Sequence, residues 1–391
     1  MQVDLQCVNA LFSCGEAIMS KVVIILGGYG NFGKRIAESL SHHDITLLIA
    51  GRNEAKAQQC IAQLQNQSRA VLKPWQVDIH ADDFTERLAA QNPFMVIHTS
   101  GPYQGQNYTV PQACIASGAH YIDLADDRRY VCDISALDRA ASTKGVLIVS
   151  GASSVPGLSS AVIDKYSIAF KSIQSIDIAI APGNQAQRGV ATIAAILTYT
   201  GHPFEVFKEG RWQSIHGWMD AKSHDFGGIA KRRLLANVDV PDLALFPKRY
   251  AVADRVSFQA GLELPLLHWG MVGMAALAKW GIVKNWSPLA KQLDKLSNCF
   301  LHFGSDIGAM EVSISGLAES EKPRKVIWRL YAPNGQGPYI PTLSTIIIAK
   351  KLLNETLDKT GALPCSGLLE LSEFEPYFET FEIYQKTQVE E

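Results

Sequence analysis

A glycine-rich turn directly after an apolar segment is the feature that most constrains the fold of this chain. Residues 21–27 (KVVIILG) form a continuous apolar run, which is typical of a parallel strand buried on both faces. Gly28, Gly30 and Gly33 follow with the spacing G-x-G-x-x-G, and apolar residues recur at helical intervals over 32–40. The strand, turn and helix together predict the first unit of a dinucleotide-binding fold.

Each glycine of this turn has a separate predicted role. Gly28 permits the tight turn, Gly30 lets the backbone approach a pyrophosphate, and Gly33 lets the helix pack close to the strand. Free N–H groups at the helix N-terminus favour phosphate groups. The alternative is a glycine-rich turn without a ligand. The predicted cofactor-binding residues of the turn are Gly28, Tyr29, Gly30, Asn31, Phe32 and Gly33.

The end of the second predicted strand indicates which dinucleotide would bind. NAD sites place Asp or Glu near this point to bond the ribose 2′-hydroxyl. Here the chain has Arg52 and Asn53, with Arg52 nineteen positions after Gly33. A guanidinium can pair with a 2′-phosphate through two parallel hydrogen bonds, whereas a carboxylate would repel it. The sequence therefore predicts NADP(H), with Arg52 and Asn53 in the cofactor site; the alternative is that Arg52 is an ordinary exposed arginine.

Strands and helices alternate with short connections up to residue 150. Pro74 cannot donate to a sheet ladder, so its strand is expected toward an edge. The alternation predicts an α/β fold with a doubly wound, Rossmann-type parallel sheet. The predicted strands are 21–27, 45–50, 71–77, 94–98, 120–124 and 146–149, and the predicted helices 32–40, 57–64, 82–91, 109–117 and 134–143.

The pattern changes after Gly151. Strands and helices no longer alternate strictly, which predicts a second, α+β domain with an antiparallel or mixed sheet. Its predicted strands are 175–181, 309–316 and 325–331, the last two forming a hairpin, and its helical stretches are 190–197, 264–300 and 342–358. The expected divisions of the chain are a poorly ordered extension 1–18, a nucleotide domain 19–150, a second domain 151–340 and a C-terminal segment 341–391.

Composition excludes several classes of protein. Hydrophobic residues make up 47% of the chain and charged residues 19%, the reverse of a disordered sequence. Lys and Arg number 36 against 38 for Asp and Glu, so the basic excess typical of a nucleic-acid binder is missing. The seven cysteines form no C-x-x-C pair and no H-E-x-x-H occurs, so we predict no metal site and a reducing, cytoplasmic location.

The most apolar segment is 264–283. His268 and Lys279 interrupt it, which favours a core or surface-groove helix over a membrane span. The alternative is a helix that contacts a membrane peripherally. Residues 1–18 contain no Lys or Arg and make a poor signal peptide, and Met19 is a candidate start of the natural protein.

Polar residues follow the fourth predicted strand, at the sheet edge where open α/β sheets bind ligands. Ser100, Gly101 and Pro102 form a loop that is expected to pass beside the nucleotide, and Asp78 after the third strand joins the predicted cofactor-binding set. Tyr103 is the predicted proton donor or substrate orienter. The alternative is an aromatic ring that packs beside the proline, because buried tyrosines also need hydrogen-bond partners.

Two further residues are candidates for catalysis. Asp123 ends the fifth strand and could hold a substrate ammonium or tune a neighbouring acid. His98 is a candidate because histidine ordinarily titrates near neutral pH, although a histidine inside an apolar run is more often a core residue. The small residues of 151–157 suit the nicotinamide end of the cleft. Arg188 and the run 231–233 could bind a substrate carboxylate or phosphate, or form a solvated face.

Several segments resemble the saccharopine dehydrogenase-like oxidoreductases. They are GGYGNFGKRIAESL (27–40), AGRN (50–53), HTSGPYQGQNYTVPQACIASGAHYIDLADD (98–127), VLIVSGASSVPGLSSAVID (146–164) and, more loosely, GPYIPTLSTIIIAKKLL (337–353) and GALPCSGLLEL (361–371). The resemblance implies an NADP-binding Rossmann domain, a substrate or dimerisation domain, and a C-terminal segment that packs back toward the nucleotide domain. It also implies hydride transfer at a carbon–nitrogen bond. The chain has Ala125-Asp126-Asp127 where many relatives have a Gly-Glu pair.

Three functional hypotheses follow. The first is an NADP(H)-dependent oxidoreductase that acts on the imine or secondary amine of a small amino-acid-derived substrate. The second, suggested by 264–283, is a reductase of the same fold with a hydrophobic, lipid-like substrate. The third is an NADP-binding regulatory or scaffold protein without catalysis. The expected partners are a small-molecule substrate and a second copy of the chain, and no nucleic acid.

Overall fold

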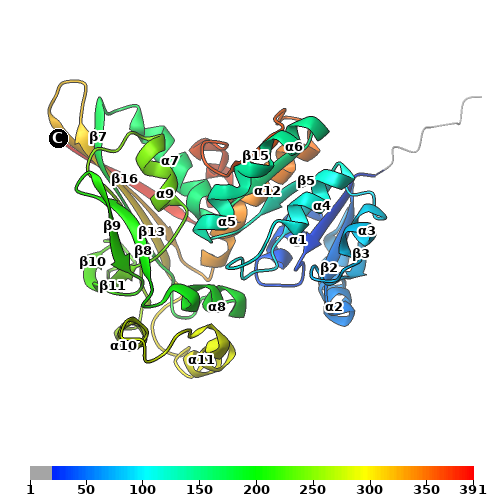
Figure 1. The fold of residues 1–391 in the computed structure, drawn as a ribbon, viewed down its shortest axis with the longest axis horizontal. Helices are drawn as coiled ribbons and strands as arrows, with labels where there is room; N and C mark the ends of the chain where they lie inside the picture. The colour runs from blue at the N-terminus through cyan, green and yellow to red at the C-terminus, as the bar shows by residue number, and fades with distance from the viewer. Residues whose placement is uncertain (1–19) are drawn as a thin grey trace, which may run out of the picture.

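A computed structural model describes residues 20–391, and the predicted extension 1–18 lies outside them. Two seven-stranded sheets organise this part of the chain, the first built mostly from the blue-to-teal N-terminal residues and the second from green-to-red residues further along the chain (Figure 1). The first is a parallel sheet with helices on both faces, and the second is mixed. The predicted fold class, a Rossmann-type sheet plus an α+β domain, is confirmed.

The first sheet has the strand order β15-β6-β5-β4-β1-β2-β3, with every adjacent pair parallel. Successive residues of β1 face two different cores, because Val23 and Ile25 pack on one side and Ile24 and Leu26 on the other. This explains the continuous apolar run. β3, which contains Pro74, is the edge strand, as predicted. The strands are β1 (Val22–Leu26), β2 (Thr46–Gly51), β3 (Val71–Gln76), β4 (Met95–His98), β5 (His120–Asp123), β6 (Leu147–Ser150) and β15 (Gly361–Pro364).

Helices cover both faces of this sheet. The predicted helices are found with shifts of a few residues at their ends, and 134–143 begins instead as a 3-10 turn before α6. The helices are α1 (Gly33–Leu40), α2 (Glu54–Leu64), α3 (Phe84–Ala89), α4 (Thr109–Ser117), α5 (Arg128–Cys132) and α6 (Asp138–Lys144). The predicted stretch 342–358 is α12 (Ile340–Leu353), which ends five residues earlier and lies against α1.

The C-terminal residues contribute to both sheets. β15 pairs in parallel with β6 and adds a seventh strand to the first sheet, whereas β16 (Tyr384–Glu390) pairs antiparallel with β14 of the second. Neither strand was predicted. The expected divisions at residues 150 and 340 stay predictions.

The second sheet has the order β10-β11-β12-β7-β13-β14-β16. Its central pair β12–β7 is parallel and its other pairs are antiparallel. The predicted hairpin is confirmed as β13 and β14. The strands are β7 (Ser172–Ala181), β10 (Lys222–Asp225), β11 (Arg232–Asn237), β12 (Arg255–Ala260), β13 (Gly308–Leu317) and β14 (Pro323–Ala332), and β8 (Pro203–Lys208) with β9 (Arg211–His216) forms a separate hairpin.

The second half contains α7 (Ser159–Ser167), α8 (Val190–Tyr199), α9 (Asp242–Arg249), α10 (Pro265–Lys279), α11 (Ala290–Asn298) and α13 (Glu375–Thr380). The predicted helical stretch 264–300 is therefore two helices, α10 and α11, which a 3-10 turn separates. Over residues 20–391, no helix is long and apolar enough to cross a membrane.

One core joins the two sheets. Val149 of β6 and Ile346 of α12 belong to the same buried cluster as Ile178 of β7 and Trp328 of β14. The face of the first sheet that carries α1 and α12 is therefore packed toward the second domain. This packing brings the glycine turn next to the loops of the second sheet.

Candidate functional site

The glycine turn has the close backbone contacts that its sequence predicts. The N–H of Gly28 donates to the carbonyl of Ala50 at 3.1 Å, and that of Gly30 donates to the carbonyl of Gly27 at 2.8 Å. A Cβ atom on Gly33 would lie 2.3 Å from the carbonyl oxygen of Gly27, closer than any side chain allows. The third glycine is therefore required for α1 to approach β1.

The N-terminus of α1 leaves donors free. The N–H groups of Asn31, Phe32 and Gly33 donate to no acceptor within residues 20–391. Unpaired N–H groups at a helix N-terminus attract phosphate, and the helix dipole adds to this attraction. The residues present therefore fit the pyrophosphate of a dinucleotide.

The end of β2 is arranged around Tyr29. Its ring lies over Gly51, where a Cβ atom would come within 2.7 Å of it, and its hydroxyl accepts the N–H of Asn53 at 3.0 Å. The side chain of Asn53 caps α2 by accepting the N–H of Lys56 at 3.0 Å. The exposed guanidinium of Arg52 has no ion-pair partner in the described residues. Arg52 is thus free to meet a 2′-phosphate.

The loop after β4 lies against the glycine turn. The hydroxyl of Thr99 donates to the carbonyl oxygens of Leu26 and Gly27, at 2.8 and 3.1 Å. The predicted residues Ser100, Gly101 and Pro102 line a cavity of about 370 Å³ together with Ile79, His80, Gln104, Gly105, Gln106, Asn107, Thr109 and Val110. Asp78 is half-buried beside it and accepts the N–H of His80 at 3.1 Å.

The three predicted catalytic residues are buried below these loops. Tyr103 was expected to face the cofactor, but its phenol is turned inward and donates to the carbonyl of His98 at 2.5 Å, within a cluster that includes Tyr130. His98 is completely buried, its Nδ1 lies 3.0 Å from the hydroxyl of Tyr121, and burial lowers its pKa to about 3. The phenol of Tyr103 has a protein partner, whereas the Nε2 atom of His98 is buried without one, and neither side chain lines a described cavity. Direct catalysis by either stays a prediction.

Asp123 connects the ends of β5 and β6. Its Oδ1 accepts the N–H groups of Ala125 and Gly151, at 2.9 and 2.8 Å, and the hydroxyl of Ser150 at 3.0 Å. Its Oδ2 has no partner, and burial raises its pKa to about 6 despite these donors. The geometry gives Asp123 a role in holding the loops that follow the two strands. A contact between Asp123 and substrate stays a prediction.

A larger cavity, of about 480 Å³, lies between the two domains. It reaches from the start of α1, at Asn31 and Phe32, past Ser154 to the ends of β7 and β13 and to the inner sides of α8, α10 and α11. Apolar side chains and glycines make up most of its walls. Within the described residues, Arg188 is the single charged side chain of the lining.

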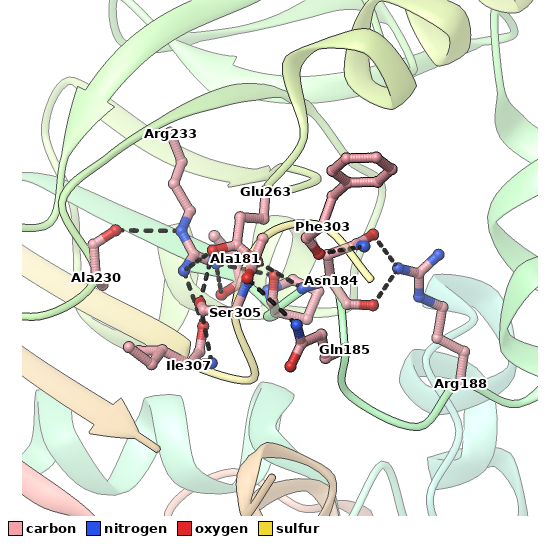
Figure 2. A network of polar contacts seen from close by, with 12 residues as sticks. Ala181, Asn184, Gln185, Arg188, Ala230, Arg233, Glu263, Phe303, Ser305 and Ile307 are labelled. Atoms are coloured by element: carbon pink, nitrogen blue, oxygen red, sulfur yellow. Dashed lines mark hydrogen bonds and ion pairs between the residues drawn. The ribbon is translucent and has the colours of Figure 1, made fainter. Parts of the chain in front are cut away.

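A polar network fixes the loop that carries Arg188 (Figure 2). The buried Arg233 pairs with Glu263 at 3.3 Å. It also donates to four carbonyl oxygens, those of Ala181, Pro182, Ala230 and Ile307. Glu263 accepts the N–H of Asn184 at 2.7 Å and that of Ser305 at 2.8 Å. One guanidinium nitrogen of Arg188 then donates to both oxygens of Asn184, at 2.5 and 2.6 Å.

The network divides the basic residues that sequence analysis grouped together. Arg233 is internal and holds the fold, Arg232 is exposed beside Asp225, and Arg188 faces the cavity. The sequence shows no sign of this division, since it contains only an isolated arginine and the charge run 231–233.

Gln187 joins this loop to the glycine turn. Its side-chain oxygen accepts from Lys34 at 3.1 Å and from Arg35 at 3.3 Å, and its carbonyl accepts from Asn31 at 3.4 Å. The second domain thus contacts the glycine turn and the start of α1 directly. Sequence analysis missed Gln187, because a single glutamine in a loop carries no recognisable pattern.

Within residues 20–391, no three His, Cys, Asp or Glu side chains gather closely enough to hold a metal ion. The described cysteines are unpaired, and Cys60, Cys114 and Cys365 are buried.

Comparisons with known proteins add to this geometry. Residues 23–149 match the family model of the saccharopine dehydrogenase NADP binding domain. The apo structure of histidine-tagged saccharopine dehydrogenase (L-Glu forming) from Saccharomyces cerevisiae is similar over 95% of this chain and 100% of that chain, with 13% identity and a TM-score of 0.68. A short-chain dehydrogenase from Sphingobium yanoikuyae in complex with NADPH is similar over 33% of this chain and 71% of its own, with 13% identity and a TM-score of 0.26. No curated protein matches the sequence.

Proposed function

We propose that this saccharopine dehydrogenase-like chain is an NADP(H)-dependent oxidoreductase with a hydrophobic substrate. Its family resemblance and its fold support an oxidoreductase with a nicotinamide cofactor. The observation that carries the substrate class is the apolar cavity, because it runs from the glycine turn into the second domain. A substrate in this cavity would lie next to the expected cofactor position.

The preference for NADP(H) rests on Arg52. Arg52 follows β2 directly and is exposed, and its guanidinium forms no ion pair with a carboxylate of the described residues. Asn53, which caps α2, replaces the acidic residue that would select NAD. When bound, the reduced nicotinamide supplies the hydride, and the protein places it against the substrate.

The charge of the cavity argues against a small amino-acid-derived substrate. Such a molecule carries an ammonium and a carboxylate, and burial of either without a partner is costly. The described lining contains no Asp or Glu to meet an ammonium, and it offers Arg188 alone to a carboxylate. A largely apolar molecule with one polar group fits these walls better. The resemblance implies that the bond reduced in this substrate is a carbon–nitrogen bond, and this stays a prediction.

Arg188 is positioned to orient the polar group. Asn184 holds one of its nitrogens, and the remaining N–H groups have no partner among the described residues. Since this side chain also lines the cavity, it can donate to a carbonyl or carboxylate oxygen there. The apolar walls exclude water around the reacting atoms.

The test is oxidation of NADPH by the purified chain with two sets of substrates. One set contains enones, enoyl esters and imines with apolar chains, and the other contains imines formed from amino acids and 2-oxo acids. We expect turnover with the first set. Turnover confined to the second set would refute the hydrophobic substrate, and tight NADPH binding without turnover by either set would favour the regulatory or scaffold hypothesis.

A paired substitution connects turnover to the cavity. Gly270 lines the cavity, Gly273 is exposed one turn further along α10, and a Cβ atom at either glycine meets nothing within 4 Å. We expect Gly270→Trp to lower kcat/KM for an apolar substrate by about tenfold or more, because the indole fills space that the substrate needs. Gly273→Trp is the matched control and should keep wild-type turnover. Both variants should bind NADPH as the wild type does.

The cytoplasmic location and the homodimer expected from the sequence remain parts of this proposal. Fractionation of cells that express the full chain tests the first, and sedimentation of the purified protein tests the second.

A further inference from the structure

Large apolar side chains are exposed along α10, α11 and the segments next to them. Eight of the fifteen exposed large hydrophobic residues within 20–391 lie between Leu266 and Phe303. Figure 1 shows these two helices together at one extremity of the second domain. We call this surface the α10–α11 face; its most exposed members are Leu266, Trp269, Trp280, Ile282, Leu296 and Phe303, at 54–72% exposure.

The charge of this face is opposite to that of the rest of the chain. Four exposed lysines lie within residues 265–303, namely Lys279, Lys284, Lys291 and Lys295. The single acidic residue of the same segment is the half-buried Asp294. The segment is therefore cationic, although the whole chain has a net charge of −2. Exposed Trp, Leu and Phe beside lysines are the composition of protein surfaces that lie in the headgroup region of anionic bilayers.

The large cavity opens on this face. Leu266 and Gly270 of α10 and Leu296 of α11 are exposed, and all three also line the cavity. The cavity thus extends from the glycine turn to a surface of tryptophans and lysines. Trp286 keeps the intervening segment against α10, because its Nε1 donates to the carbonyl of Met274 at 2.9 Å.

We infer that the α10–α11 face docks on an anionic lipid surface, from which a hydrophobic substrate enters the cavity. The docking rests on the exposed side chains and their charge, and the entry of substrate rests on the proposed function. Trp269, Trp280 and Ile282 insert among the lipid headgroups, and the lysines contact the anionic phosphates. Contact is peripheral, because α10 has 15 residues and is too short to span a bilayer.

A second copy of the chain fits this face less well. A symmetric dimer places the same patch on both sides of the interface, so it would bring two sets of four lysines toward each other with little acidic charge to meet them. An anionic bilayer instead attracts all four lysines.

The test measures binding of the full chain to vesicles by sedimentation. Vesicles of phosphatidylcholine with phosphatidylglycerol are compared with vesicles of phosphatidylcholine alone. We expect binding to the anionic vesicles that weakens as salt is raised, because exposed charges are screened. Absence of binding to the anionic vesicles would overturn the inference.

Two variants assign the binding to this face. Trp280→Ser with Ile282→Ser removes two side chains that are 72% and 66% exposed and that do not line the cavity. We expect at least about tenfold weaker binding to anionic vesicles, since each side chain loses the gain of leaving water. Lys291→Glu with Lys295→Glu should weaken binding comparably. Trp212→Ser is the matched control on β9, where the tryptophan is 50% exposed, and it should bind as the wild type does.

Turnover separates the docking from the proposed reaction. The Trp280 and Ile282 double variant should keep wild-type turnover with a short, water-soluble substrate and lose it selectively for a substrate presented in vesicles. Vesicle binding by the wild type without turnover of any substrate would support docking and contradict the proposed function. A wild-type dimer that the double variant converts to monomer, with equal vesicle binding by the two proteins, would show that a second copy covers the face and would overturn docking.

Discussion

The raised pKa of Asp123 predicts a specific pH dependence of stability. The folded protein holds this carboxyl at a pKa of about 6, against a usual value of 3.8, because the group is completely buried. Between these two pH values the folded protein binds a proton that the unfolded chain does not bind. The contribution of Asp123 to stability is therefore greatest below about pH 4 and is lost as the pH rises through about 6. The difference corresponds to about 3 kcal/mol.

Asp123→Asn isolates this contribution. The amide oxygen can accept the same three donors, from Ala125, Ser150 and Gly151, and the amide group does not ionise. The free energy of unfolding of the variant, taken relative to that of the wild type, should therefore rise by up to about 3 kcal/mol from about pH 4 to pH 7. Asp242 is also buried with its pKa raised to about 7, but it is present in both proteins, so its effect cancels in the comparison.

Urea unfolding followed by tryptophan fluorescence, at a series of pH values, measures the difference. Asp123→Ala is the contrasting variant, because it leaves all three donors without an acceptor and should lose several kcal/mol at every pH, at about 1–3 kcal/mol for each unsatisfied group. Stability profiles of wild type and Asp123→Asn that run parallel from pH 4 to about 7 would refute the reasoning.

Three further predictions concern the cofactor site and its neighbours. Arg52→Ala should raise the KM for NADPH roughly 10- to 150-fold, the range that a charged hydrogen bond of about 1.5–3 kcal/mol gives, and should leave the KM for NADH unchanged; equal effects on both cofactors would exclude a role in recognising the 2′-phosphate. Tyr103→Phe leaves the buried carbonyl of His98 without its donor, so the free energy of unfolding in urea should fall by about 1–3 kcal/mol. The same variant should lower turnover more than it lowers cofactor affinity; wild-type turnover would rule out any catalytic contribution of the phenol. Gln187→Ala removes the acceptor of Lys34 and Arg35 and should weaken NADPH binding, while the Tm of the whole chain, measured by calorimetry, stays unchanged; identical binding would show that this contact does not shape the cofactor site.

Local patterns predicted the helices and strands of residues 20–150 well, because these elements are set largely by near neighbours in the sequence. The glycine turn needs three residues without side chains at fixed spacing, and the structure contains the close contacts that require them. Pro74 marked the edge strand because proline cannot donate to a ladder. The hairpin of β13 and β14 was predicted for the same reason, since one short polar loop separates its strands.

Long-range contacts account for what was not predicted. β15 has four residues and is a strand because the edge of β6 is available to it, more than 200 positions earlier in the chain. Tyr103 was expected to face the cofactor because it follows β4, but the direction of its side chain depends on the space beside Tyr130. The cavity arises where two domains meet, so no single segment contains its pattern. The segment 264–283 showed that an apolar surface existed without showing that it would meet this cavity.

The path of the C-terminal residues also has a consequence for the order of folding during synthesis. β6 is an edge strand until Gly361–Pro364 leaves the ribosome. The backbone N–H and C=O groups on its outer side therefore stay unpaired for most of translation. The outer side of β14 likewise stays unpaired until Tyr384–Glu390 has been synthesised. Contacts this distant in sequence slow folding, because a long loop must close before they form. The nascent chain is therefore most exposed to misassembly and proteolysis before β15 and β16 appear, and deletion of 384–390 should lower its yield in cells more than loss of the same number of loop residues.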